Sequence, residues 1–161
     1  MFFWYIATAV FAVGWVFRDP RFDYRLLIVG SVLPLIDGLF GGARALYSVV
    51  TAIAVLVVVM LATIGRRSLR KVLLGLPIGM ILHLVFSAAW DDTDVFWWPL
   101  TGWSIDGDPP LPVVAHGWWS VALEVVGIVG CIALWRHNGL SSAERRREFL
   151  HTGQLDVAVR H

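Results

Sequence analysis

Five stretches of the chain are dominated by hydrophobic residues, and segments richer in charged residues, glycine or proline separate them. The stretches cover about residues 2–17, 26–41, 45–64, 72–90 and 114–135. The last three reach the roughly 20 residues that a membrane-spanning helix needs. The stretch 26–41 is shorter and contains Pro34, so we expect a short or broken helix there. The pattern predicts an all-α, polytopic integral membrane helix bundle of about five transmembrane segments.

Composition favours the same class of protein. Hydrophobic residues make up 58% of the chain and charged residues 16%, and the mean hydropathy is +0.71, which is unusual for a soluble domain. The single cysteine, Cys131, lies in an apolar run, so a disulfide within the chain is excluded. The sequence contains no nucleic-acid-binding module and no nucleotide-binding glycine loop, and we expect no nucleic-acid partner.

The basic residues predict the orientation of the bundle. All of them except Arg44 fall in 18–25, 65–71 or the tail 136–161, whereas 91–113 has neither lysine nor arginine. Because basic loops stay on the cytoplasmic side, we expect a multi-pass protein of the plasma membrane, with an extracytoplasmic outer loop at 91–113 and a cytoplasmic basic tail. Within the tail, Ser141 and Glu144 form a capping-box pattern that predicts a short helix, and its basic run is expected to contact anionic lipid.

Tryptophans cluster in or beside the outer loop. They are Trp90, Trp97, Trp98, Trp103, Trp118 and Trp119. Tryptophan is enriched where a membrane protein meets the headgroups, so most of them are expected to form an interfacial belt. The dense aromatic run at 96–103 is also a candidate docking surface. The partners that this pattern predicts are membrane lipids and a second membrane protein.

Polar and ionisable residues recur at helical spacing inside the apolar stretches. Three sets share this spacing: Gly75, Gly79, His83, Ser87 and Asp91; His116, Ser120 and Glu124; and Gly30, Pro34, Asp37 and Gly41. Residues four apart lie on one helix face, and ionisable groups are too costly to face lipid, so we expect the sets to converge in the outer half of the bundle. The small residues Gly75 and Gly79 should let a neighbouring helix approach closely.

Two uses of such a cluster remain open. Imidazoles and carboxylates are the ligands that Zn²⁺ or Mn²⁺ takes in a catalytic site, where bound water becomes a nucleophile. In this interpretation Asp37, His83, Asp91 and His116 bind a divalent metal. Glu124 is then a general base, and Arg44 binds the substrate anion. Alternatively, the groups pair with each other and fix the register of the helices.

Residues 26–103 resemble the LexA-regulated, membrane-bound metal-dependent hydrolase family, a group of small multi-helix membrane proteins. The matching segments are LPLID at 33–37, GGARALYS at 41–48, PIGMILHLVFSAAWDD at 77–92 and VFWWPLTGW at 95–103. The resemblance implies a metal site in which Asp37 and His83 are ligands. Leu35, Tyr47 and Ser87 stand where the family pattern has Asp, His and Asp. A site here would therefore have to recruit Asp91, Asp94, His116 or Glu124.

The departures from the family pattern lead to two functional hypotheses. The first is a degenerate, non-catalytic accessory or scaffold subunit, in which Tyr47 fills the vacated space and hydrogen-bonds Asp37 or His83. The second is a metal-dependent hydrolase that acts on a lipid or a lipid-linked phosphate or ester at the outer membrane face. A proton-handling role for Glu124 and His83 is a weaker third, because no polar residue continues the path inward from Glu124.

Overall fold

The computed structural model describes residues 1–19, 22–40, 45–102 and 117–155, and within these ranges all regular secondary structure is helical. The α-helices are α1 (Phe2–Phe17), α2 (Tyr24–Val32), α3 (Val49–Ala62), α4 (Arg67–Leu73), α5 (Gly75–Phe86), α6 (Thr93–Phe96), α8 (Trp118–His137) and α9 (Ala143–Thr152). Three 3-10 helices join them: η1 (Leu33–Phe40), η2 (Ala45–Tyr47) and η3 (Ala89–Asp91). The all-α part of the prediction is confirmed for these residues.

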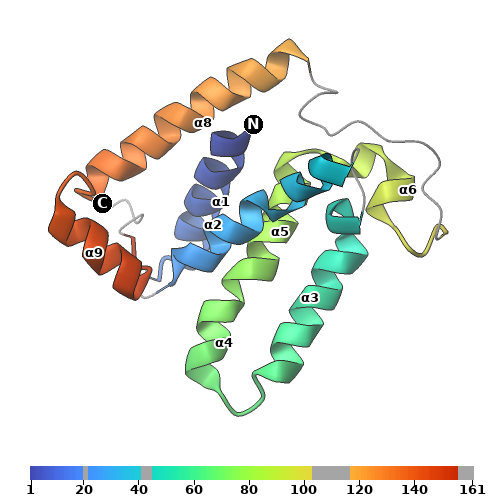
Figure 1. Ribbon diagram of the computed structural model, residues 1–161, viewed down its shortest axis with the longest axis horizontal. Coiled ribbons are helices and arrows are strands. Elements are labelled where there is room, and N and C mark those ends of the chain that lie inside the picture. Colours follow the sequence, from blue (N-terminus) through green and yellow to red (C-terminus); the bar gives the residue numbers. More distant parts are fainter. Residues whose placement is uncertain (20–21, 41–44, 103–116, 156–161) are drawn as a thin grey trace.

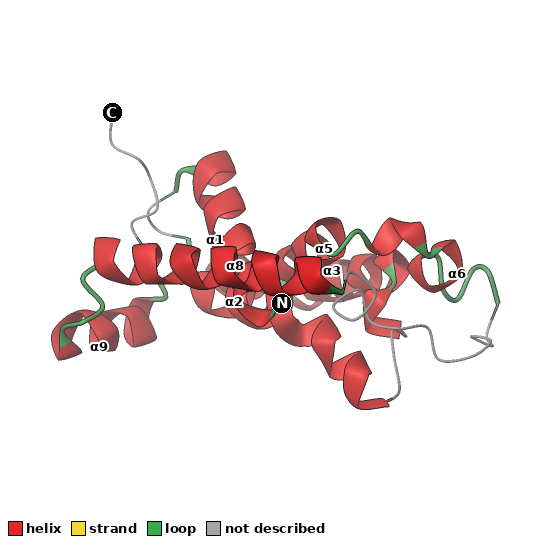
Figure 2. Ribbon diagram, turned by 90° about the horizontal axis from the view of Figure 1, so that it is seen from above, coloured by secondary structure: helices red, strands yellow, loops and turns green. Residues whose placement is uncertain are grey.

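The long helices form a row in which α1, α2 and α5 are central. The most extensive packing is between α2 and α5, and α1 packs on α2, α5 and α8. The edges of the row are α8, which packs on α1, and α3, which packs on α5 (Figure 1). In both views α9 lies at the end of the molecule opposite α6 (Figure 2).

Two helical stretches are long and apolar enough to cross a membrane. They are Arg67–Phe86, formed by α4 and α5, and Trp118–His137, and each contains 20 residues. The apolar helices α1 and α3 are shorter, with 16 and 14 residues. A single long helix over 45–64 is not formed, because Ser48 caps α3 by accepting a hydrogen bond from the Val50 amide. Large apolar side chains remain exposed along α1, α3 and α8, as expected of surfaces that face lipid.

Two prolines interrupt the helices that surround the centre of the row. The α-helix α2 ends at Val32 and continues as the 3-10 helix η1, which contains Pro34. The predicted break in 26–41 is therefore confirmed. Pro77 lies in the first turn of α5. It has no amide hydrogen to donate to the carbonyl four residues earlier, at Leu73, where α4 ends.

Glycines bring the backbones of α2 and α5 into direct contact. A Cβ atom at Gly79 would lie 2.3 Å from the Leu27 carbonyl oxygen and 2.7 Å from the Ser31 amide nitrogen. A Cβ atom at Gly30 would lie 2.1 Å from the Leu76 carbonyl oxygen. The close helix approach that the sequence predicts at Gly75 and Gly79 is confirmed, and its partner is α2.

The tail folds back onto the bundle through two capped helix ends. At the end of α8, Gly139 has a left-handed φ of 61°, and the Leu140 amide donates to the Trp135 carbonyl over 3.0 Å. Together with the bond of 3.1 Å from the Gly139 amide to the Arg136 carbonyl, it forms a Schellman motif, which turns the chain sharply. The helix α9 then begins after Ser142, whose hydroxyl accepts a bond from the Arg145 amide. Ser142 is thus the capping residue, and the assignment of that role to Ser141 was wrong.

We predict that the substitution Gly79→Ala strongly destabilises the protein. The added methyl group would collide with two backbone atoms of α2, so the helices must separate, at a cost of about 1–3 kcal/mol. Thermal unfolding in detergent measures the effect. Gly130→Ala is the control, because its Cβ atom would meet only side chains, at 3.0 and 3.3 Å. Equal stability of the two variants would contradict the α2–α5 contact.

Candidate functional site

His83 is the buried polar centre of the molecule. It lies on α5, and its side chain is 1% exposed. The Nδ1 atom is 2.6 Å from the Ser31 carbonyl oxygen, and the Nε2 atom is 3.0 Å from the Tyr47 hydroxyl. A carbonyl oxygen can only accept, so Nδ1 carries a hydrogen. Burial in an apolar bundle favours the neutral ring, in which Nε2 keeps its lone pair. The Tyr47 hydroxyl therefore donates to Nε2, and both nitrogens of a neutral imidazole are satisfied.

The Ser31 carbonyl is available because of the helix break that follows it. In a 3-10 helix each carbonyl accepts from the amide three residues later. For Ser31 that residue is Pro34, which has no amide hydrogen. The imidazole of His83 supplies the missing donor. The Gly79 contact makes this possible, since Gly79 lies one helical turn before His83 and brings α5 against this part of α2.

Tyr5 covers one face of the imidazole. It comes from α1, and its ring centroid lies 3.9 Å from that of His83, with the ring planes inclined by 39°. Tyr5 is 1% exposed, and its hydroxyl has no hydrogen-bond partner among the described residues. A hydrogen bond also ties α1 to the end of α5, since the Trp4 indole donates to the Phe86 carbonyl over 3.3 Å.

Asp37 lies on η1 beside the same cluster. It is buried, and its Oδ2 atom accepts a hydrogen bond of 2.8 Å from the Leu46 amide. This bond links η1 to η2, the element that carries Tyr47. Residues of α1, α2 and η2 thus contact the buried imidazole on α5, and Asp37 bonds η1 to η2 beside it.

Glu124 of α8 contacts the first turn of α1, the helix that carries Tyr5. Its carboxylate accepts hydrogen bonds from the first amides of α1, at 3.1 Å from the Phe3 nitrogen and 3.4 Å from the Trp4 nitrogen. The residue before α1 is Met1, whose side chain cannot cap a helix, so these amides need an acceptor from elsewhere. Gly127 allows the approach, because a Cβ atom there would lie 2.2 Å from the Trp4 nitrogen. Glu124 therefore acts as an N-terminal cap for α1.

The polar stripe of α5 ends before Asp91. The helix stops at Phe86, and Ala88 has a left-handed φ of 55°, so the chain changes direction there. Ser87 is buried, with its hydroxyl 3.3 Å from the Leu84 carbonyl, whereas Asp91 is exposed in η3. The prediction that one helix carries the stripe as far as Asp91 was wrong. Asp94, another candidate ligand, is also exposed.

The last two candidate site residues, Arg44 and His116, lie outside the described residues. Within the described part of the chain, no group of three or more histidine, cysteine, aspartate or glutamate side chains is arranged to hold a metal ion. The predicted contact between Tyr47 and His83 is confirmed. The position in which the family resemblance expects a ligating histidine is thus occupied by a phenol that donates to His83.

Ser48 is a structural residue that the sequence analysis missed. Its hydroxyl caps α3 and also bonds the Trp98 carbonyl and, over 3.2 Å, the Phe96 carbonyl. It thereby fixes the aromatic segment 96–98 next to Tyr47. A serine immediately before an apolar run is a helix-start signal that could have found the cap. Nothing in the sequence pairs it with residues 50 positions later.

Comparisons with protein-family models, with curated proteins and with solved structures find no match to this chain. The resemblance to membrane-bound metal-dependent hydrolases therefore remains an expectation from the motifs.

We predict different effects from removing the hydroxyls of Tyr47 and Tyr5. Tyr47→Phe leaves Nε2 of His83 without a donor, so it should lower the free energy of unfolding by about 1–3 kcal/mol. Tyr5→Phe removes a hydroxyl that has no partner among the described residues, so it should be neutral or stabilising. The two variants are matched in size and burial. A thermal unfolding comparison in detergent in which Tyr5→Phe is the more harmful change would contradict the assigned hydrogen bonds.

Proposed function

We propose that this chain is a non-catalytic accessory or scaffold subunit of a membrane assembly. The observation that carries the proposal is the state of His83, whose two nitrogens are both engaged, by the Ser31 carbonyl and the Tyr47 hydroxyl. A histidine binds a metal through an unprotonated nitrogen lone pair, and Tyr47 occupies the only one that His83 has. The buried polar cluster joins helical elements, because the His83 imidazole on α5 is hydrogen-bonded to both α2 and η2.

The proposal includes the location and the topology of the protein. The five segments would cross the plasma membrane with the 91–113 loop outside and the tail inside, as the distribution of basic residues predicts. Support comes from the apolar side chains that α1, α3 and α8 leave exposed. Examples are Phe11 at 43%, Val58 at 62% and Val129 at 61%. Such surfaces suit lipid tails far better than water.

The tryptophan-rich outer region is the proposed docking surface for a membrane-protein partner. Ser48 holds the 96–98 segment. Large apolar side chains remain exposed in and beside this segment, at Trp90, Trp97 and Leu100, and at the start of α8, at Trp118 and Trp119. Aromatic side chains on a fixed backbone lose little conformational entropy when they bind, and they dominate many protein interfaces.

The alternative is a metal-dependent hydrolase that acts on a lipid or a lipid-linked phosphate or ester. It would require the Tyr47 hydroxyl to leave Nε2 of His83, so that Asp37 and His83 could share a Zn²⁺ or Mn²⁺ ion with further ligands. Elemental analysis of the purified protein distinguishes the two proposals.

We predict that the native chain lacks stoichiometric zinc or manganese, and that restoring the family ligands creates a site. The restoring change is Leu35→Asp, Tyr47→His and Ser87→Asp together, which frees Nε2 of His83 and adds three donors. Metal content after purification, measured with a check of folding by gel filtration in detergent, is the readout.

The control is the same triple variant with His83→Ala, which should lose the metal again. Stoichiometric metal in the native protein that disappears on His83→Ala would overturn the scaffold proposal in favour of the hydrolase. A folded triple variant that binds no metal would show that the motif positions do not form a site in this bundle.

A further inference from the structure

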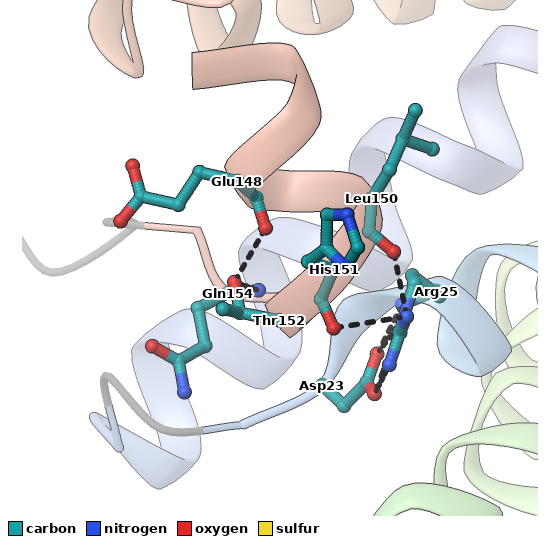
Figure 3. A network of polar contacts seen from close by, with 7 residues as sticks. All are labelled: Asp23, Arg25, Glu148, Leu150, His151, Thr152 and Gln154. Atoms are coloured by element: carbon teal, nitrogen blue, oxygen red, sulfur yellow. Dashed lines mark hydrogen bonds and ion pairs between the residues drawn. The ribbon is translucent and has the colours of Figure 1, made fainter. Parts of the chain in front are cut away.

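The C-terminal end of α9 is anchored to the start of α2. Figure 3 shows the Arg25 guanidinium between the Asp23 carboxylate and the last turn of α9. Arg25 bonds Asp23 on both oxygens, at 3.0 and 2.6 Å, and donates to the Leu150 carbonyl over 2.8 Å. A cation at a helix C-terminus also interacts favourably with the helix dipole. The Tyr24 amide adds a bond of 2.8 Å to the Gly153 carbonyl.

Packing reinforces this anchor. Gly153 lies directly on the Asp23 carboxylate, since a Cβ atom there would be 1.9 Å from Oδ1. Phe149 and the buried Leu155 pack into the apolar cluster of α1 and α2. Burial would raise the pKa of the Asp23 carboxyl, but the hydrogen bonds and the charge of Arg25 outweigh it and lower this pKa below its ordinary value. The carboxylate therefore stays charged, and the tail helix is a fixed part of the fold.

The anchored helix presents one basic face outward. Helical spacing places Arg146, Arg147 and Leu150 together, and both carboxylates of α9, on Glu144 and Glu148, fall on another face. Leu150 is 66% exposed. One nitrogen of Arg146 bonds the Ser141 carbonyl over 3.2 Å, which holds its side chain beside the α8–α9 turn. An exposed leucine between arginines is typical of a helix that lies in the membrane interface.

The position of α9 along the chain sets its depth. The apolar helix α8 ends with the half-exposed Trp135 and with Arg136, residue types that mark the headgroup level. The Schellman turn after α8 is compact, and α9 starts only six residues after its last residue. The basic face of α9 therefore lies close to the headgroups.

We propose that the Arg146–Arg147–Leu150 face binds the headgroups of anionic phospholipids in the leaflet where α8 ends. The guanidinium groups bind lipid phosphate by charge-assisted hydrogen bonds, and Leu150 inserts among the upper parts of the acyl chains. Charge complementarity favours anionic headgroups, because the Arg146–Arg147–Leu150 face carries two cations and no carboxylate.

The test measures stabilisation of the full-length protein by added lipid. Thermal unfolding in detergent is followed while phosphatidylglycerol or phosphatidylcholine is added. The native protein should be stabilised more by the anionic lipid. This preference, expressed as a ratio of apparent affinities, should fall roughly five-fold for each arginine removed in Arg146→Gln with Arg147→Gln.

Two further variants keep the test decisive. Arg145→Gln with Glu148→Gln removes an ion pair of 2.7 Å on the same helix without changing the net charge, and should keep the lipid preference. Arg147→Gln alone changes a side chain outside the α8–α9 turn, so it still reports if the double arginine variant misfolds. An unchanged preference in Arg147→Gln, or equal stabilisation by inorganic phosphate, would overturn the proposal.

This inference rests on the membrane location in the proposed function and not on the state of His83. A chain that stays folded and monodisperse without detergent would contradict the membrane location. Indifference to lipid charge in a detergent-dependent protein would contradict the headgroup site alone.

Discussion

The need to satisfy a buried imidazole is the constraint on which this structure depends. His83 lies in the most closely packed part of an apolar bundle, where an unpaired polar group costs free energy comparable to a lost hydrogen bond or more. Three features of the sequence satisfy it together. Gly79 lets α5 touch α2, Pro34 leaves the Ser31 carbonyl without a donor, and Tyr47 supplies a hydroxyl to the second nitrogen. Without the other two, each of these residues would only lower stability, because glycine and proline weaken a helix and a buried hydroxyl needs a partner.

The same constraint explains why the site looks like a metal centre in the sequence. A histidine, an aspartate and their helical spacing suit metal ligation, but they suit a hydrogen-bonded hub equally well. The two uses differ in what binds the lone pair on Nε2 of His83, and here that partner is the Tyr47 hydroxyl from η2. Asp37 likewise bonds the Leu46 amide, which closes the segment that delivers Tyr47. The polar residues therefore hold each other in place across five elements.

Some of this arrangement could be predicted from the sequence, because it depends on local chemistry. Proline and glycine have strong local effects, so the break in 26–41 and the close approach at Gly79 were predictable. The Tyr47–His83 contact followed from the motif resemblance together with the rule that a buried phenol needs a partner.

Other parts could not be read from spacing. The polar stripe would reach Asp91 only if α5 continued that far, and no glycine or proline between Phe86 and Asp91 signals the left-handed turn at Ala88. Spacing gave an expected depth for Glu124, but its role as the cap of α1 depends on which helix lies beside α8. The acceptor for His83 is a backbone carbonyl, which no side-chain pattern reveals. The docking of α9 depends in the same way on a tertiary contact, between Arg25 and the carbonyls that end the helix.

The most direct test of the central claim is the nitrogen-15 NMR spectrum of His83 in the native protein. With histidine labelled and His83 assigned by comparison with His83→Ala, the account predicts a neutral ring with a protonated Nδ1 and an unprotonated, hydrogen-bonded Nε2. Adding one equivalent of Zn²⁺ should leave both resonances unchanged, because Tyr47 already occupies the lone pair. A zinc-dependent shift of Nε2, or a ring protonated at Nε2, would contradict the account.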